Sequence, residues 1–511
     1  MIKRFWEGMK APERRRVFYA LLGGKALGLA LLFLIIAGIP AYFGHKAHAD
    51  TAPPTPAYVN PINTLWVLVT AFLVFFMQAG FMFLEAGFAR TRETVNVLLE
   101  GIVDTCLCGL LFWAWGFAFM FGSGNGFIGH EFFFLHGAPE TYGTTGVSIL
   151  AFFLFQYAFA DTCSTITSGA MIGRTGFWGD LLYSFGVSGF IYPIFGHWAW
   201  GPDGWLNNIK PAAFHDFAGS TVVHTIGGVV SLAGAIVLGP RLGRKFKRDG
   251  GGAMPGHDMT IAAVGGVILW FGWYGFNPGS TLSAMDLHGI GRVAANTTLA
   301  ACAGGLTAMF WMYPRNKVWD AGMTINGFLA GLVAITCPCY WVSPFGAIMI
   351  GAIAGPVCAL WVDLMEYLRI DDPVGACAVH LAGGVWGTLS LGLFATGQYG
   401  APTPLGADNS AASVVTGLFY GGGASQLIAQ MKGSFSIAAA VFVASMALMY
   451  LTKYTVGLRI SKEGELEGLD LHEHGGGAYP ELWGSGTGGG IPGGATAHAV
   501  EGAPVVAKAT I

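Results

Sequence analysis

The sequence has few charged residues for its length. Asp, Glu, Lys and Arg supply only 11% of the 511 residues, whereas a soluble domain carries about 25%. So little charge does not cover the surface of a soluble protein of this size, which excludes an ordinary cytosolic enzyme. Hydrophobic residues make up 53% of the chain, which excludes a disordered chain. The composition indicates a helical protein that crosses a membrane several times.

A strong net charge and a cysteine framework are lacking as well. The net charge of −3 provides no positive field for phosphates, which excludes a nucleic-acid-binding protein. The eight cysteines form no CxxC pair and no zinc-ligand spacing. We therefore expect small buried thiols, no cofactor and no resident metal. Only Cys337-Pro-Cys339, at a predicted helix end, leaves a metal or redox role open.

The first 49 residues have the pattern of a signal peptide. Seven basic residues lead into the apolar stretch 26–39, and Ala47-His48-Ala49 fits the small-x-small cleavage pattern. An uncleaved additional anchor is the alternative. We predict five regions: a signal peptide at 1–49, a periplasmic segment at 50–62, a transmembrane domain at 63–457, a cytoplasmic tail at 458–483, and a disordered Gly- and Ala-rich tail at 484–511.

Long apolar stretches separated by short polar breaks predict eleven membrane spans. Each stretch has about the 20 residues that a helix needs to cross the hydrocarbon core. The fold class is therefore an all-α polytopic membrane protein in the lipid bilayer. The predicted spans are 63–87, 94–121, 146–172, 180–199, 217–239, 258–277, 293–313, 321–337, 344–366, 373–396 and 434–457.

The basic residues predict the orientation of these spans. Fifteen Lys and Arg residues fall in the loops and tail on one side, and only Lys210, Arg292 and Lys432 fall on the other. The positive-inside rule places the fifteen in the cytoplasm. The amino end is then outside and the carboxyl end inside, in a multi-pass protein of the cell inner (plasma) membrane.

Two predicted spans share a sequence pattern. Residues 216–229 are DFAGSTVVHTIGGV and residues 372–385 are DPVGACAVHLAGGV, so Asp, Gly, Val, His and Gly-Gly-Val recur at the same offsets. The two spans are the fifth and the tenth, and they cross the membrane in opposite directions. This predicts a five-plus-five inverted repeat, with the eleventh span outside it. The repeat would bring His224 and His380 together near the midplane.

The two histidines are costly polar side chains at membrane depth, so we expect them to face the interior. Each could simply bond a neighbouring helix. As symmetric partners, two neutral imidazoles could instead share one proton, offer a donor or acceptor to a small polar solute, and relay protons. A haem held by His224 and His380 is a competing interpretation. The small residues beside each histidine indicate close helix packing, which leaves no room for haem.

Polar and aromatic residues near the span ends suggest further roles. Asp216 and Asp372 precede their histidines by eight residues, about 12 Å along a helix, where a carboxylate caps backbone N–H groups. Asp216 could also add a negative field that favours a cation at the outer entrance. Ring faces of Phe159 and of the segments 197–200 and 270–280 could bind that cation, or the rings could belong to an interfacial belt.

Several of these segments resemble the ammonium transporter branch of the Amt/Rh/Mep family. The resemblance extends from about residue 63 to residue 480. The motifs that carry it are DFAGSTVVH at 216–224, FQYAF at 155–159, WYGFNPGS at 273–280, and Asp371-Asp372-Pro followed by His380.

The resemblance implies a role for nine residues. It also implies a homotrimer with a pore in each subunit, and a regulatory tail near 467–480 that binds PII-type signalling proteins. The implied site consists of Phe159, Trp200 and Ser280 as the outer ammonium-binding site, Phe159 and Phe276 as stacked gate rings, Asp216 as an essential acid near that site, His224 and His380 as the paired pore histidines, and Trp273 and Gln156 close by.

A transporter for nitrogen uptake, and not an enzyme, follows from this resemblance. Ammonium would be captured outside and lose its proton, because a bare cation is very costly in a dry pore. Ammonia would then cross, with net proton or charge transfer. An ammonium sensor acting through a cytoplasmic partner and a neutral gas channel of the Rh type are the alternatives. Asp161, Gly173 and Gly375 depart from the family's pattern.

Overall fold

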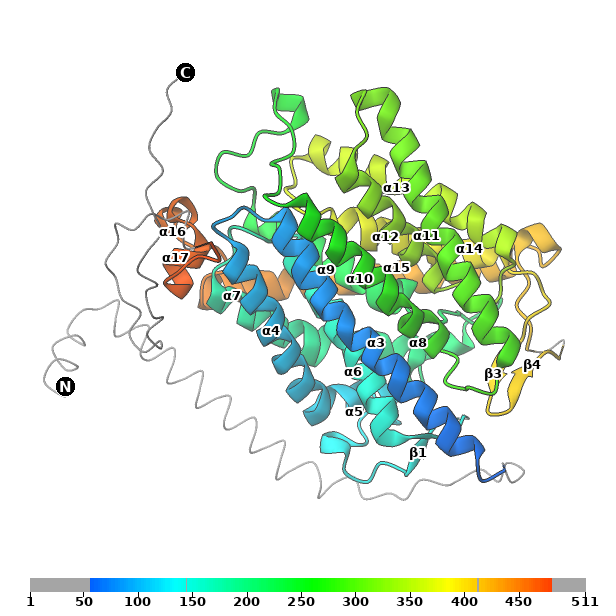
Figure 1. Cartoon of the computed structure of the whole chain (residues 1–511). Coiled ribbons are helices and arrows are strands. Elements are labelled where there is room, and N and C mark those ends of the chain that lie inside the picture. The colour runs from blue at the N-terminus through cyan, green and yellow to red at the C-terminus, as the bar shows by residue number, and fades with distance from the viewer. Residues whose placement is uncertain (1–55, 144, 411–412, 480–511) are drawn as a thin grey trace, which may run out of the picture.

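A computed structural model describes residues 56–143, 145–410 and 413–479. The chain is a bundle of long helices (Figure 1), with the two hairpins at one end and the last two helices at the other. The α-helices are α3 (Val59–Phe88), α4 (Thr94–Leu111), α5 (Phe117–Phe121), α6 (Ile149–Gly169), α7 (Phe177–Gly186), α8 (Tyr192–Trp200), α9 (Ile226–Leu238), α10 (Met259–Gly279), α11 (Leu287–Asn316), α12 (Ala321–Thr336), α13 (Pro344–Leu368), α14 (Gly383–Phe394), α15 (Ser425–Thr455), α16 (Lys462–Glu467) and α17 (Leu469–His474).

Shorter elements interrupt or connect these helices. Four π-helical turns continue the neighbouring α-helices, and the strands form two antiparallel pairs, β1 with β2 and β3 with β4. The π-helical turns are η1 (Phe112–Gly116), η3 (Val187–Ile191), η5 (Ser220–Thr225) and η7 (Cys377–Ala382); the 3-10 turns are η2 (Phe133–Leu135), η4 (Trp205–Asn208), η6 (Lys247–Asp249) and η8 (Leu418–Tyr420); the strands are β1 (Thr141–Tyr142), β2 (Val147–Ser148), β3 (Ala401–Thr403) and β4 (Gly406–Asp408).

Local sequence signals start several of the long helices. Asp258 caps α10 by accepting hydrogen bonds from the N–H groups of the first turn, and Asp320 does the same for α12. Ser343 caps α13, where Pro344 occupies the first helical position. Proline suits that position because its missing N–H would have no partner there.

Each of the eleven predicted spans overlaps a helical segment. Among the described residues, nine helices are long and apolar enough to cross a membrane. Of the remaining two segments, α12 has only 16 residues, and residues 177–200 are divided among α7, η3 and α8. The protein is thus an all-α polytopic membrane protein, whereas the eleven crossings, their orientation and the inverted repeat stay predictions.

Two boundaries differ from those predicted. The first long helix begins at Val59, inside the segment 50–62, and α15 begins at Ser425 instead of 434. Lys432 therefore lies within α15, and its ammonium group donates to the carbonyl of Lys210 (2.7 Å). A lysine inside a helix can bury its stem and still reach a polar surface, so its charge did not mark the helix end. The predicted signal peptide (1–49) and Gly- and Ala-rich tail (484–511) lie outside the described residues.

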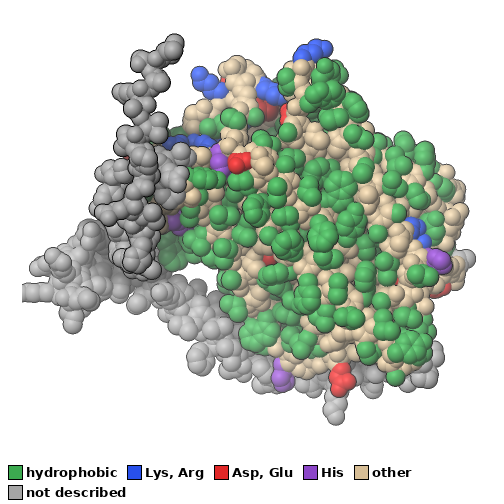
Figure 2. Space-filling view, viewed as in Figure 1, with side chains coloured by type: hydrophobic (Ala, Val, Ile, Leu, Met, Phe, Trp, Pro, Cys, Tyr) green, Lys and Arg blue, Asp and Glu red, His purple; other side chains and the backbone are tan. Residues whose placement is uncertain are grey.

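One face of the bundle is largely apolar. Figure 2 shows hydrophobic side chains over most of the visible face, with Lys and Arg at its margins. On α3, Phe72, Phe75, Phe76 and Phe83 are all exposed. Exposed aromatic side chains on a helix that is otherwise buried inward suit contact with lipid.

Candidate functional site

Two π-helical turns hold the paired histidines. His224 lies in η5 and His380 lies in η7, at equivalent positions of the two matching segments. A π-turn adds a residue to a helical turn and often marks a functional position. The repeated sequence pattern therefore corresponds to a repeated irregularity of the backbone.

A capping aspartate precedes each of these turns. The Asp216 carboxylate accepts four backbone N–H groups, from Gly219 to Val222, at 2.8–3.0 Å. The Asp372 carboxylate accepts the N–H groups of Ala376 and Cys377 at 2.9 and 2.8 Å. The predicted capping is confirmed at both positions. The bonds of Asp216 all go to the start of η5, so this acid first of all fixes the turn that carries His224.

The imidazoles of His224 and His380 are in contact. Their Nδ1 atoms are 3.2 Å apart and their ring centroids 5.2 Å apart, as the repeat predicted. Both side chains are buried. At this distance one Nδ1 donates and the other accepts, so the pair fits two neutral rings that share one proton. Nε2 of His224 has no hydrogen-bond partner among the described residues, which leaves one ring atom available to a passing solute.

Glycines allow the two histidine-bearing segments to cross closely. A Cβ atom on Gly228 would lie 2.4 Å from the backbone nitrogen of Leu381, and one on Gly384 would lie 2.4 Å from the carbonyl oxygen of Ser220. Both contacts are too short for any side chain. These glycines are equivalent in the two matching segments, so each segment presses its glycine against the other's backbone.

Replacing Gly384 with alanine is expected to destabilise the protein by about 1–3 kcal/mol, because the added methyl group overpacks the crossing. The neighbouring Gly383→Ala substitution is a matched control. Its Cβ would meet Val333 at 3.4 Å, which is an ordinary contact. Thermal unfolding in detergent should show a lower midpoint for Gly384→Ala only; equal midpoints would show that the crossing tolerates a side chain.

Two phenylalanine rings extend the row of rings beyond His224. Phe159 and Phe276 stack at 4.0 Å between centroids, and Phe276 is 5.4 Å from the ring of His224. Trp273 lies beside His224 at 5.2 Å, and its Nε1–H donates to the hydroxyl of Thr336 (2.9 Å). The rings thus form a buried file of Phe159, Phe276, His224 and His380.

A pocket of about 420 Å³ adjoins the first ring of this file. It is lined by Gln156, Phe159, Trp200 and Ser280 among others, so four of the predicted site residues share one cavity. The Trp200 indole donates to the carbonyl oxygen of Asp216 (2.7 Å), and the Ser280 hydroxyl donates to that of Phe276 (2.8 Å). The Gln156 Oε1 atom has no hydrogen-bond partner among the described residues.

A second pocket, of about 340 Å³, adjoins the loop that carries Asp372. Gly375 and Asn326 also line it, and the Asn326 side chain donates to the carbonyl of Val374 (3.0 Å). Asn326 and Thr336 were not among the predicted site residues. No motif surrounds them, and only the packing of α12 brings Thr336 to Trp273 and Asn326 to the second pocket.

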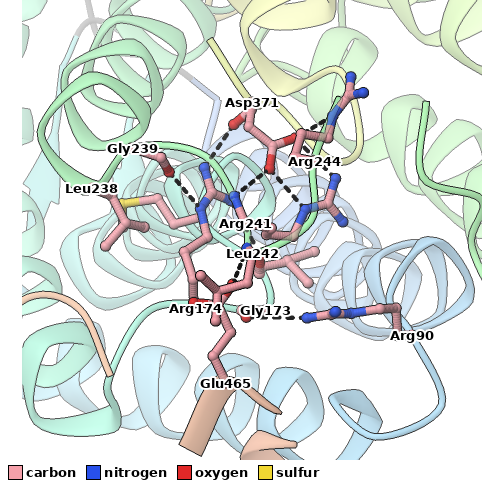
Figure 3. A network of polar contacts seen from close by, with 12 residues as sticks. Arg90, Gly173, Arg174, Leu238, Gly239, Arg241, Leu242, Arg244, Asp371 and Glu465 are labelled. Carbon is pink, nitrogen blue, oxygen red and sulfur yellow. Dashed lines mark hydrogen bonds and ion pairs between the residues drawn. The ribbon is translucent and has the colours of Figure 1, made fainter. Parts of the chain in front are cut away.

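Arginines from separate loops meet at Asp371, beside this second pocket (Figure 3). Arg241 makes a two-pronged ion pair with its carboxylate (2.8 and 2.9 Å), Arg244 adds a bond of 3.2 Å, and Arg174 donates to its backbone carbonyl (2.6 Å). Burial alone would raise the pKa of Asp371, but these arginines hold it well below its usual range. Burial also lowers the pKa of Arg174 to about 10. The acid therefore stays charged and ties its own loop to the two loops that carry Arg174 and Arg241.

A buried file of rings with a pocket beside its first ring, inside an apolar helical bundle, is typical of a membrane transport protein for a small solute. Comparisons with known proteins identify the family of transport proteins. The model described as Ammonium Transporter Family matches residues 65–479. The chain belongs to this family.

Individual relatives agree with this assignment. Ammonium transporter Amt2 of Archaeoglobus fulgidus is 42% identical, over 90% of this chain and 96% of its own length. Ammonium transporter 1 member 3 of Solanum lycopersicum is 38% identical, over 82% and 93% of the two chains. Among solved structures, one described as "Sensor Amt Protein" superimposes with a TM-score of 0.72 at 38% identity, covering 82% of this chain and 99% of its own. Mep2 of Candida albicans gives 0.71 at 27% identity, covering 84% and 93%.

Proposed function

We propose that this ammonium transporter captures the ammonium ion in the pocket beside Phe159. The ring faces of Phe159 and Trp200, whose centroids are 6.1 Å apart, offer cation–π attraction. The Ser280 hydroxyl and the unpartnered Gln156 Oε1 offer acceptors for the N–H groups. Asp216 acts through its place at the start of η5 and its negative field, not by direct contact.

Ammonium then gives up its proton before it passes the stacked gate of Phe159 and Phe276. A bare cation in this buried file would lose its hydration without gaining a counter-charge, which costs many kcal/mol. Neutral ammonia avoids that cost and keeps hydrogen bonds to the pore histidines. The contact between His224 and His380 at 3.2 Å is the single observation that carries this proposal, because it places two polar rings in an otherwise apolar path.

The proton is proposed to follow the ammonia, by relay through the histidine pair or by a separate route, so that uptake is electrogenic. Purified protein in proteoliposomes should give an inward current with ammonium, a smaller one with methylammonium and none with potassium. Liposomes without protein serve as the control. Ammonia flux without current would reject the electrogenic part and favour a neutral channel. The absence of any flux would reject transport.

A sensor that reports ammonium through a partner is the second candidate. The structural relative described as a sensor, at 38% identity, favours considering it. A sensor needs only binding, so saturable ammonium binding to the purified protein together with zero flux would support this candidate over transport.

We further propose the assembly and placement that the family resemblance implies. Three subunits form a homotrimer in the inner (plasma) membrane, each with its own pore, eleven spans and an outer amino end. The basic loops joined at Asp371 and the adjoining tail (Arg459–Glu465, 2.6 Å) support placing that end of the bundle in the cytoplasm. The described part of the tail is then the surface that a PII-type protein could contact.

A further inference from the structure

A second polar region lies behind the wall of the candidate pore. Helix α4 packs against α3, α6 and α7, and five carboxylic acids from these helices gather along it. Each is at most 5% exposed. Asp161 follows the gate residue Phe159 by two positions, about 200° around α6, so this region lies on the far side of α6 from the rings. We call it the acidic seam: Glu85, Glu100, Asp104, Asp161 and Asp180.

Hydrogen bonds join the acids of α4 and α6. The Asp104 carboxylate accepts from the hydroxyls of Ser164 (2.8 Å) and Thr165 (3.2 Å) on α6. The Asp161 Oδ2 atom accepts from the hydroxyl of Thr105 (3.2 Å) on α4. Each helix thus supplies both an acid and a hydroxyl, and all three donors are uncharged.

The other three carboxyls also accept from neutral donors. None of the five forms an ion pair with a basic side chain within the described part of the chain. The donors are Ser168 to Glu85, Asn96 to Glu100 and Tyr183 to Asp180. The further titratable groups that face the seam are Cys108 on α4, Tyr157 and Cys163 on α6, and Tyr183 on α7.

Some oxygens in the seam have no partner at all. Asp161 Oδ1 and Asp180 Oδ2, on residues that are each 2% exposed, accept no hydrogen bond from the described residues. A buried carboxylate without a counter-charge is costly, and so is a buried oxygen without a donor. No group of three or more His, Cys, Asp or Glu side chains among the described residues is placed to hold a metal ion. A proton on these carboxyls removes the cost of the buried charge.

We propose that the acidic seam is a proton-binding site of the membrane domain, filled from the cytoplasmic side and separate from the ammonium path. Loading transfers one proton from a cytoplasmic buffer acid to a carboxylate oxygen, which gives a neutral carboxyl group and leaves the conjugate base in the cytoplasm. Asp161 and Asp104 hold the inner end of the site, where hydroxyls bridge the two helices.

In this proposal the mouth of the site is the first turn of α4, where the tail makes contact. At the first turn of α4, the N–H of Asn96 donates to Asp470 (2.9 Å), and the Asn96 side-chain oxygen accepts from Nε2 of His474 (2.9 Å). The amide of Asn96 in turn donates to Glu100 (2.8 Å). Burial lowers the pKa of His474, which keeps its ring neutral. On the proposed route, a proton from the cytoplasm passes the contact that the tail makes with α4.

Infrared spectra of the full-length protein in lipid vesicles test the site. At pH 7 the wild type should show the C=O stretch of protonated carboxyl groups. Asp161→Asn and Glu100→Gln, which keep the shape of the side chain, should each remove the intensity of about one such group. Asp363→Asn is the matched control, because Asp363 is 40% exposed and pairs with Lys247 at the surface.

A wild-type spectrum without this band at pH 7 would overturn the proposal, and no variant is needed for that result. A band that both seam variants leave unchanged would overturn it as well. The role of the tail has its own readout. His474→Ala should speed hydrogen–deuterium exchange of the band several-fold, since it opens the mouth; an unchanged rate would show that protons enter elsewhere.

Discussion

Replacing His224 with alanine is expected to lower the discrimination between ammonium and potassium by about tenfold or more, equivalent to about 1.4 kcal/mol or more. The ring of His224 fills the file between Phe276 and His380, at 5.4 and 5.2 Å from their centroids. Alanine leaves room there for water. A hydrated cation then crosses without the full cost of desolvation, and the reason for losing the proton disappears.

The measurement is the ratio of ammonium to potassium current in proteoliposomes, compared with the wild type. His380→Ala should have an effect of the same direction, because the two rings share one contact. His288→Ala is the matched control: His288 is exposed on α11, so its loss should leave the ratio unchanged.

An unchanged ratio together with unchanged total flux in His224→Ala, in protein that still unfolds at the wild-type temperature, would place the conducted species outside the ring file. The same ratio with a lower total flux would mean that the histidine aids passage of ammonia and that exclusion of cations depends on the stacked gate. In that case Phe159 and Phe276, whose centroids are 4.0 Å apart, become the residues that set selectivity.

Periodic features of the fold were accessible from the sequence. Apolar stretches of about 20 residues locate helices because the hydrocarbon core sets their length, and each predicted span overlaps a helical segment. The contact between His224 and His380 was predicted from the repeated sequence pattern, on the expectation that matching segments of an inverted repeat meet near its axis. The capping roles of Asp216 and Asp372 followed from their distance of eight residues.

Features that depend on long-range packing were not accessible. Thr336 orients Trp273 only because α12 lies beside α10. Sequence singled out Asp161 as an exception to a family pattern, yet gave no sign that its side chain turns away from Phe159 toward Thr105. Likewise Gly173, where the family often has an acid, leaves space that the carboxylate of Glu93 occupies. The carboxylate of Glu93, from the loop before α4, thus occupies the space that an acidic side chain at position 173 would need.

The largest effect on stability is expected from replacing Asp371 with alanine, a loss of about 3–5 kcal/mol. Its carboxylate is the counter-charge of Arg241 and Arg244, and its backbone carbonyl binds Arg174. Without the carboxylate, buried guanidinium groups remain with less negative charge beside them. Glu366 still pairs with Arg244, but Arg241 makes its described ion pair with Asp371. The loop that carries Arg241 would then separate from the loop that carries Asp371. Both loops line the second pocket, so its rim would open.

The pH dependence follows from the low pKa of Asp371. A carboxyl whose pKa is depressed by folding contributes stability above its unfolded value, near ~3.9, and loses it only as the pH falls through the lower folded value. The wild-type contribution is therefore constant from pH 5 to pH 8, and Asp371→Asn should be destabilised by the same amount across that range.

Thermal unfolding in detergent at several pH values measures both effects. Asp363→Asn is the control, since Asp363 pairs with Lys247 at the surface, where both side chains are at least 40% exposed, and such pairs contribute about 0–1 kcal/mol. Equal midpoints for the two variants would mean that the arginines find other partners, such as loop carbonyls. A deficit of Asp371→Asn that grows with rising pH from 5 to 8 would contradict the assigned charge, because the wild-type group would then be ionising within that range. A large loss of stability in Asp371→Asn that stays constant from pH 5 to pH 8 would identify the buried carboxylate as its cause.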